Sequence, residues 1–138
     1  MRVYIAIKYH EDNSNREHIE RISSALGEHG FETICITRDL EKWGQVQFDL
    51  STLMQRTFNE IDASDVVVVD LTEKGVGIGI EAGYAFAKNI PIVTIAKEGS
   101  DISETLQGIS HKVFLYNRFD ELAHFFAEWL GEFETMEI

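Results

Sequence analysis

The sequence predicts a three-layer α/β fold in which helices cover both faces of a five-stranded parallel sheet. Short apolar segments alternate with longer segments of helical periodicity along the 138 residues, a pattern typical of parallel sheets with crossover helices. One apolar segment, Val66–Val69, consists of four valines between two aspartates. Such a continuous run indicates a strand that is buried on both faces, and therefore a central one.

The first half of the chain supplies two strands and two helices. We expect strands at 2–8 and 31–37, where apolar and β-branched residues dominate. Residues 16–29 carry an apolar stripe and end before a glycine, which is typical of a helix. Residues 38–47 form a charged loop, and a second amphipathic helix is expected at 49–63.

The second half continues the alternation and sets the expected topology. After the valine strand, the expected strands are 91–96 and 112–116, and the expected helices are 80–87, 101–109 and 119–133. Ser100 or Asp101 would cap the helix at 101–109. Because connections are short and crossovers right-handed, we expect the strand order 2-1-3-4-5, as in flavodoxin-like and other Rossmann-like folds.

Length and composition limit the expected partners and location of the protein. The length fits a single domain over residues 1–138. A net charge of −12 disfavours nucleic acid or an anionic membrane as a partner. Cys35 is the only cysteine, so an internal disulfide is excluded and a buried core position is expected. No segment has the pattern of a signal peptide or the length of a membrane span, so we expect a cytoplasmic protein.

A glycine-rich turn follows the central strand. Gly75, Gly77 and Gly79 have a spacing that matches neither the dinucleotide fingerprint GxGxxG nor a Walker loop. A strand, a turn and a helix in this order place a helix N-terminus at the carboxyl edge of the sheet, where α/β folds bind ligands. The glycines either let a ligand approach the backbone or allow close packing of the helix on the sheet.

Three segments together resemble the nucleoside 2-deoxyribosyltransferase family, which includes 2′-deoxynucleoside 5′-monophosphate N-glycosidases. They are Ile61-Asp62-x-x-Asp65 with the valines, Gly77-x-Gly79-x-Glu81-x-Gly83-Tyr84-Ala85, and Pro91-Ile92-Val93. The resemblance implies that Glu81 is the nucleophile and that Tyr4, on the first strand, supports it. It implies a nucleoside or nucleotide substrate; we expect no cofactor.

The chemistry of those residues agrees with this implication. Breaking an N-glycosidic bond develops positive charge at C1′, which a carboxylate can attack to form a glycosyl-enzyme. We expect the helix dipole to keep Glu81 ionised and Tyr4 to orient the carboxylate. The structural alternatives are a helix-stabilising charge at Glu81 and a half-buried strand residue at Tyr4.

Two positions depart from the family pattern. Thr57 stands where the family has an aspartate that protonates or holds the base, and a hydroxyl is no general acid at neutral pH. Gly75 stands where the family binds the sugar or phosphate through Asp or Ser. The loop after the first strand, Lys8–Glu11, also lacks the small residues that cradle phosphate in the monophosphate enzymes. Asp70, Glu73 or His10 would be the substitutes.

Several further residues have a proposed role and a structural alternative. Trp43 either stacks on the base or covers the sheet edge. Asp70 either contributes to the site or caps its strand. The resemblance implies that a neighbouring subunit contributes Ser110, and hence a homodimer or higher oligomer. The histidines have no metal-ligand spacing, so no metal site is predicted. His18 and His29 are expected to be solvated on a surface helix.

Two other functions remain open at this point. An NAD-type N-glycohydrolase would need no acid, because nicotinamide leaves a cationic glycoside as a neutral molecule. A non-catalytic nucleotide-binding sensor would keep the glycine turn and tolerate the substitutions at Thr57 and Gly75.

Overall fold

Five parallel strands form one sheet in the computed structural model, which describes residues 1–136, with side chains in the last helix described to Trp129 and at Glu132. The order is β2-β1-β3-β4-β5, which confirms the expected topology. The strands are β1 (Arg2–Ala6), β2 (Glu32–Ile34), β3 (Val66–Asp70), β4 (Ile92–Lys97) and β5 (Lys112–Tyr116). In register, Val3 to Ala6 of β1 pair with Val66 to Val69 of β3.

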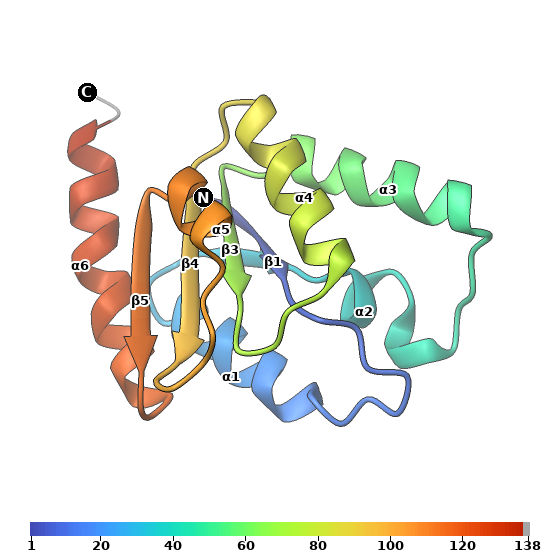
Figure 1. The fold of residues 1–138 in the computed structure, drawn as a ribbon, viewed down its shortest axis with the longest axis horizontal. Helices are drawn as coiled ribbons and strands as arrows, with labels where there is room; N and C mark the ends of the chain where they lie inside the picture. Colours follow the sequence, from blue (N-terminus) through green and yellow to red (C-terminus); the bar gives the residue numbers. More distant parts are fainter. Residues whose placement is uncertain (137–138) are drawn as a thin grey trace.

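Helices cover both faces of this sheet (Figure 1). α1 (Arg16–Gly27) and α6 (Asp120–Met136) pack on one face, and α3 (Leu50–Asp62), α4 (Val76–Ala87) and α5 (Glu104–Ile109) pack on the other. This arrangement confirms the three-layer α/β fold. No helix in the described part of the chain is both long and apolar enough to cross a membrane.

The central strand joins two hydrophobic cores, one on each face. Val66 and Val68 belong to the core under α1 and α6, whereas Val67 and Val69 belong to the core under α3 and α4. All five residues of β3 are buried, because successive side chains of a strand point to opposite faces and both faces are covered. Asp70, two residues after Val68, points to the same face of the sheet as Val66 and Val68.

Two further short helices occupy the region expected to be the end of the second strand and a loop. β2 ends at Ile34, and the chain turns into α2 (Ile36–Asp39) and then a 3₁₀ turn, η1 (Lys42–Gly44). The Asp39 carboxylate accepts a hydrogen bond from the Cys35 amide at 2.8 Å, which stabilises the first turn of α2. Cys35 itself is buried, as expected.

Helix starts also differ from the sequence expectation. α4 begins at Val76, with Gly75 in extended conformation (φ −164°) before it. The glycine-rich segment therefore forms the first turn of the helix rather than a loop preceding it. α5 begins at Glu104, where the Ser103 hydroxyl accepts the Leu106 amide, so neither Ser100 nor Asp101 is the cap.

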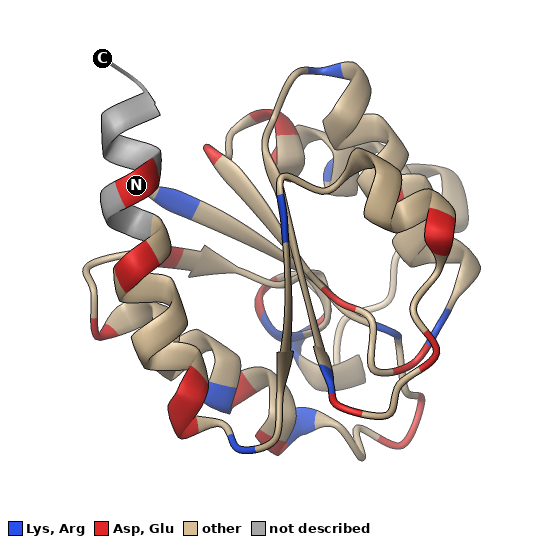
Figure 2. Ribbon diagram, turned by 60° about the vertical axis from the view of Figure 1, so that its left-hand side comes forward, with Lys and Arg blue, Asp and Glu red and all other residues tan. Residues whose placement is uncertain are grey.

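Charged side chains surround the sheet rather than entering it. In Figure 2 most acidic residues lie on helices and loops around the molecule, and the charged residues of the strands, such as Arg2, Glu32 and Lys97, lie at strand ends. Asp70 is the exception, because it is 1% exposed at the end of the central strand.

Candidate active site

Tyr4 and Glu81 meet on the α3 and α4 face of the sheet. Tyr4 lies in the middle of β1 and is 1% exposed, while Glu81 is the sixth residue of α4. The Tyr4 hydroxyl donates a hydrogen bond of 2.5 Å to Glu81 Oε1. A strand position and a helix position, 77 residues apart in sequence, thus hold one carboxylate at a defined place beside the sheet.

Burial controls the ionisation of this pair. It raises the pKa of Glu81 to about 7, against the opposing effect of the Tyr4 hydrogen bond. Burial and the nearby Glu81 charge hold the pKa of Tyr4 well above its ordinary value, so Tyr4 remains a donor. We expected the helix dipole to keep Glu81 ionised, but burial raises its pKa instead. Glu81 lies in the second turn of α4, and the dipole acts mainly within the first turn.

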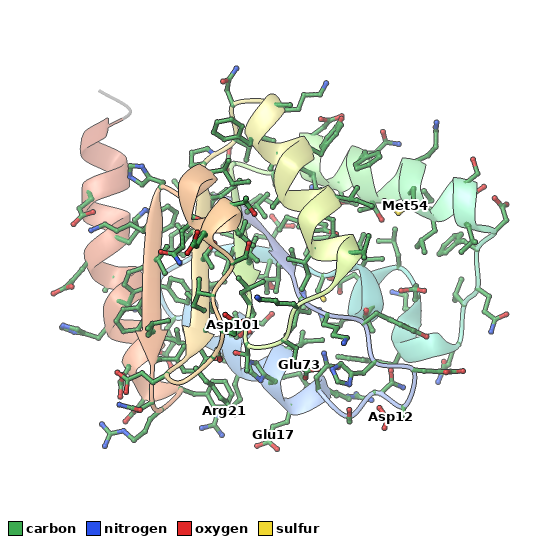
Figure 3. All side chains as sticks on the ribbon, in the orientation of Figure 1. Asp12, Glu17, Arg21, Met54, Glu73 and Asp101 are labelled. Carbon is green, nitrogen blue, oxygen red and sulfur yellow. The ribbon has the colours of Figure 1, made fainter. Side chains whose placement is uncertain are left out.

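The pair borders a cavity of about 600 Å³ between β1, the α2–η1 segment, α3 and the start of α4. This volume lies in the range typical of small-molecule sites. Met54, labelled in Figure 3, is one of the α3 side chains in its wall. The polar lining, apart from Tyr4 and Glu81, includes Lys8, Tyr9, Thr37, Glu41, Gln47 and Thr57.

The glycines of α4 leave space beside the helix. Gly75 and Gly77 line the cavity with Glu81, and Gly79 lines a second cavity of about 550 Å³ on the side of α5. A Cβ added at Gly77, Gly79 or Gly83 would meet no atom within 4 Å. Close packing on the sheet therefore does not require these glycines.

Lys8 places a positive charge at the same cavity. It follows β1, lines the wall, and lies beside the start of α4, with its Cγ 3.7 Å from the position of a Cβ on Gly75. Among the described residues, no carboxylate pairs with its ammonium group. A lysine side chain beside a helix start favours an anionic ligand there.

Thr57 and Gly75, the two positions that depart from the family pattern, both line this cavity. Thr57 lies on α3 and is 2% exposed. Both positions therefore border the same cavity as Glu81. Sequence reasoning missed Glu41 and Gln47 as lining residues, because the chain reaches the cavity there through irregular structure without hydrophobic periodicity.

Asp70 faces away from Glu81, toward α1 and α6. Its carboxylate accepts a hydrogen bond from the Tyr116 hydroxyl at 2.9 Å and one from the Thr72 amide at 2.8 Å, and His18 Nε2 lies 2.7 Å from it. His18 is therefore not solvated, contrary to expectation. Although burial opposes ionisation, the His18 and Thr72 contacts lower the pKa of Asp70.

His10 and Trp43, which were also expected to bind substrate, lie outside the lining of this cavity as well. His10 contacts Glu73, labelled in Figure 3, at 3.0 Å. The ring of Trp43 lies under the Arg16 guanidinium at 4.6 Å and packs against the α1 and α6 core.

Ser110 precedes β5, at the opposite edge of the sheet. Its hydroxyl donates to the Leu106 carbonyl at 2.6 Å and lies 2.7 Å from the Thr94 hydroxyl. His29 also differs from expectation, because its Nε2 is buried and has no hydrogen-bond partner among the described residues.

Known proteins with this fold include nucleoside-processing enzymes. A Bacillus psychrosaccharolyticus 2-deoxyribosyltransferase superposes with a TM-score of 0.71 at 11% identity, over 89% of this chain and 90% of that one. The CMP N-glycosidase of Clostridium botulinum superposes with a TM-score of 0.67 at 20% identity, over 94% and 99%.

Sequence comparisons agree with the fold comparison. A Thermofilum pendens protein, named as a candidate 2′-deoxynucleoside 5′-phosphate N-hydrolase 1, is 24% identical over 123 residues, which are 83% of this chain and 82% of that protein. The sequence model of the nucleoside 2-deoxyribosyltransferase family matches residues 3–124. This match includes both Tyr4 and Glu81 and spans most of the chain, which therefore belongs to the nucleoside 2-deoxyribosyltransferase family.

Proposed function

We propose that the protein cleaves or transfers the N-glycosidic bond of a nucleoside or nucleoside 5′-monophosphate, with Glu81 as the nucleophile. The observation that carries this proposal is the hydrogen-bonded pair of Tyr4 and Glu81 beside a cavity of about 600 Å³. In the described part of the chain, Glu81 and Glu41 are the carboxyl groups in the lining, and Glu81 is the one oriented by a buried donor.

The reaction divides into two displacements at C1′. The Glu81 carboxylate attacks C1′, the bond to the base nitrogen breaks, and its electron pair leaves with the base. Water or a second base then attacks C1′, and the Glu81 carboxylate is released. Hydrolysis and transfer thus differ only in the acceptor that reaches the glycosyl-enzyme.

Tyr4 has two effects on the nucleophile. Its hydrogen bond fixes one carboxylate oxygen, so the other can be directed at the sugar. The same bond favours the charged form of Glu81 and partly offsets the burial that raises its pKa to about 7. Near neutral pH, a substantial fraction of the protein therefore carries the reactive carboxylate.

Lys8 favours the nucleoside 5′-monophosphate over the nucleoside. Its side chain, which forms no ion pair with a described residue, lies beside Gly75 at the start of α4, on the wall shared with Glu81. A phosphate there would interact with both the ammonium group and the backbone N–H groups. This interaction is local, so the net charge of −12 does not prevent it.

We also propose a homo-oligomer with α4 at the interface between subunits. Val76, Ile80 and Phe86 on this helix are 83%, 47% and 55% exposed, and Gly79 and Gly83 have open space beside them. Exposed apolar side chains and small residues on one helix suit close contact with another subunit. Light scattering after size-exclusion chromatography should give at least twice the 15.7 kDa chain mass.

The direct test is a panel of ribo- and deoxyribonucleosides, their 5′-monophosphates and NAD, analysed for released base. We expect base release from monophosphates, and loss of that activity in Glu81→Gln. Glu98→Gln, which removes an exposed charge outside the lining, is the matched control and should remain active.

Three outcomes would contradict the proposal. Folded protein that releases no base at high concentration would exclude an N-glycosyl enzyme, and nucleotide binding without turnover would indicate the sensor function. Nicotinamide release from NAD alone would indicate the NAD-type glycohydrolase. Activity that persists in Glu81→Gln would exclude Glu81 as the nucleophile.

A further inference from the structure

The proposed reaction needs an acid as well as a nucleophile. An ordinary base leaves C1′ with the electron pair of the broken bond and departs more easily when a proton reaches it at the same time. Glu81 cannot supply this proton while its carboxylate attacks the sugar. Thr57 lines the same cavity as Glu81, but a hydroxyl is too weak an acid at neutral pH.

Glu41 is the second carboxyl group in the described lining of the cavity. It follows α2 and precedes η1, on the side of the cavity formed by the α2–η1 segment rather than by α4. Two-carboxylate glycosidases use this division of roles, with an acid and a nucleophile on different sides of the scissile bond. Because Glu41 and Glu81 are far apart in sequence, the sequence alone does not show that they border the same cavity.

The backbone at Glu41 is fixed although it lies between helices. Its amide donates to the Ile36 carbonyl at 3.0 Å, and its carbonyl accepts the Gly44 and Val46 amides at 3.0 and 2.9 Å. Three hydrogen bonds thus hold the residue in the wall, as a positioned catalytic group requires.

The surroundings of Glu41 favour the protonated form, in contrast to those of its neighbour Asp39. The half-buried Glu41 carboxyl has no ion-pair or hydrogen-bond partner among the described residues, and burial raises its pKa. Asp39 is also partly buried, but hydrogen bonds from Arg38 and the Cys35 amide lower its pKa. A base that fills the cavity would remove further water from Glu41 and favour its protonated form more.

We propose that Glu41 is the general acid that protonates the leaving base, an inference that rests on the proposed function. As the Glu81 oxygen bonds to C1′, the C1′–N bond breaks and the carboxyl proton of Glu41 moves to the base, which leaves neutral. Water then attacks C1′ and gives a proton to the Glu41 carboxylate, while the bond between C1′ and Glu81 breaks. Both carboxyl groups return to their starting states.

The test compares substrates that need a proton with substrates that need less help. A guanine nucleotide is compared with its N7-methylguanine counterpart, whose base leaves as a neutral molecule because the glycoside is cationic. A uracil nucleotide is compared with its 5-fluorouracil counterpart, whose base is a better leaving group. All carry the same sugar and phosphate. In Glu41→Gln, kcat on the ordinary base should fall by about 10²- to 10⁴-fold, whereas kcat on its activated counterpart should be largely retained.

The controls separate this inference from the proposed function. Glu98→Gln should behave as the unchanged protein on every substrate. If the unchanged protein cleaves the substrates and Glu41→Gln loses activity equally on both members of a pair, or loses none, then Glu41 is not the acid. If the unchanged protein releases no base at all, the proposed function fails, and the role of Glu41 fails with it.

Discussion

Two tyrosine–carboxylate pairs lie on opposite faces of the same sheet. Tyr4 donates to Glu81 at 2.5 Å on the α3 and α4 face, and Tyr116 donates to Asp70 at 2.9 Å on the α1 and α6 face. Asp70 has additional contacts with His18 and the Thr72 amide, and its pKa is lowered. Among the described residues, Tyr4 is the one hydrogen-bond partner of Glu81, which borders a cavity and has a pKa raised to about 7.

In this comparison the number of hydrogen-bond partners, more than the residue types, distinguishes the carboxylate proposed as the nucleophile from the one with a lowered pKa. Several donors compensate the burial of Asp70, so its charged form stabilises the fold. The Tyr4 hydrogen bond compensates the burial of Glu81 only in part, so a ligand that contacts the carboxylate can still lower its free energy. Four variants test this difference, in decreasing order of expected effect.

Removing the charge of Asp70 should have the largest effect on stability. Asp70→Asn leaves His18 and Tyr116 without their charged partner, so we expect a loss of about 2–4 kcal/mol in the free energy of unfolding at pH 7. Because the folded pKa of Asp70 is lowered, this contribution is present above its ordinary value of 3.8 and is lost as the pH falls through the folded value. Urea unfolding at several pH values measures it; unchanged stability would contradict the structural role.

Glu81→Gln should change the free energy of unfolding in the opposite direction from Asp70→Asn. The raised pKa means that the folded protein binds a proton more tightly than the unfolded chain, so Glu81 lowers stability as the pH rises from 4.5 to about 7. We therefore expect Glu81→Gln to stabilise the protein by about 1–3 kcal/mol at pH 8. The gain should be smaller at pH 4.5. A destabilisation at pH 8 would show that the carboxylate has partners beyond Tyr4.

Tyr4→Phe should move the pH dependence of kcat/KM. Its hydrogen bond lowers the pKa of Glu81, so its removal raises that pKa and shifts the acidic limb of the profile to higher pH by about one unit or more. Tyr116→Phe, the matched change on the other face, should lower stability without moving this limb. Equal profiles for both variants would show that the limb does not report Glu81.

Lys8→Ala should have the smallest effect. We expect KM for a nucleoside 5′-monophosphate to rise by roughly five- to tenfold and KM for the corresponding nucleoside to remain the same. Lys88→Ala, just after the far end of α4, is the control. An equal rise in KM for both substrates would exclude an interaction between Lys8 and the phosphate.

The sequence predicted the topology well because hydrophobic patterning determines it. The run Val66–Val69 indicates a central strand, and the spacing of apolar residues indicates the helices that cover it. The boundaries are less predictable. The second strand ends early because the Asp39 side chain bonds to the Cys35 amide, and α4 starts early because glycines are compatible with a first helical turn as well as with a loop.

The site was only partly predictable. Tyr4 and Glu81 followed from a family pattern, whereas the cluster of His18, Asp70 and Tyr116 unites residues up to 98 positions apart. The four valines before Asp70 do not show which face of the sheet its side chain points to, because both faces of that strand are apolar. Glu41 lies in irregular structure, where neither periodicity nor spacing indicates that its side chain borders the same cavity as Glu81.

The first turn of α4 separates the two cavities beside this helix. Gly75, Val76 and Ile78 line both of them, and Val76 is 83% exposed. Ile78, at 2% exposure, anchors the turn to the core. Local opening of this turn disrupts little buried surface, so its backbone amides should exchange hydrogen with solvent faster than those of 82–87. A ligand in either cavity would slow this exchange. Hydrogen exchange of these amides therefore reports binding in both cavities.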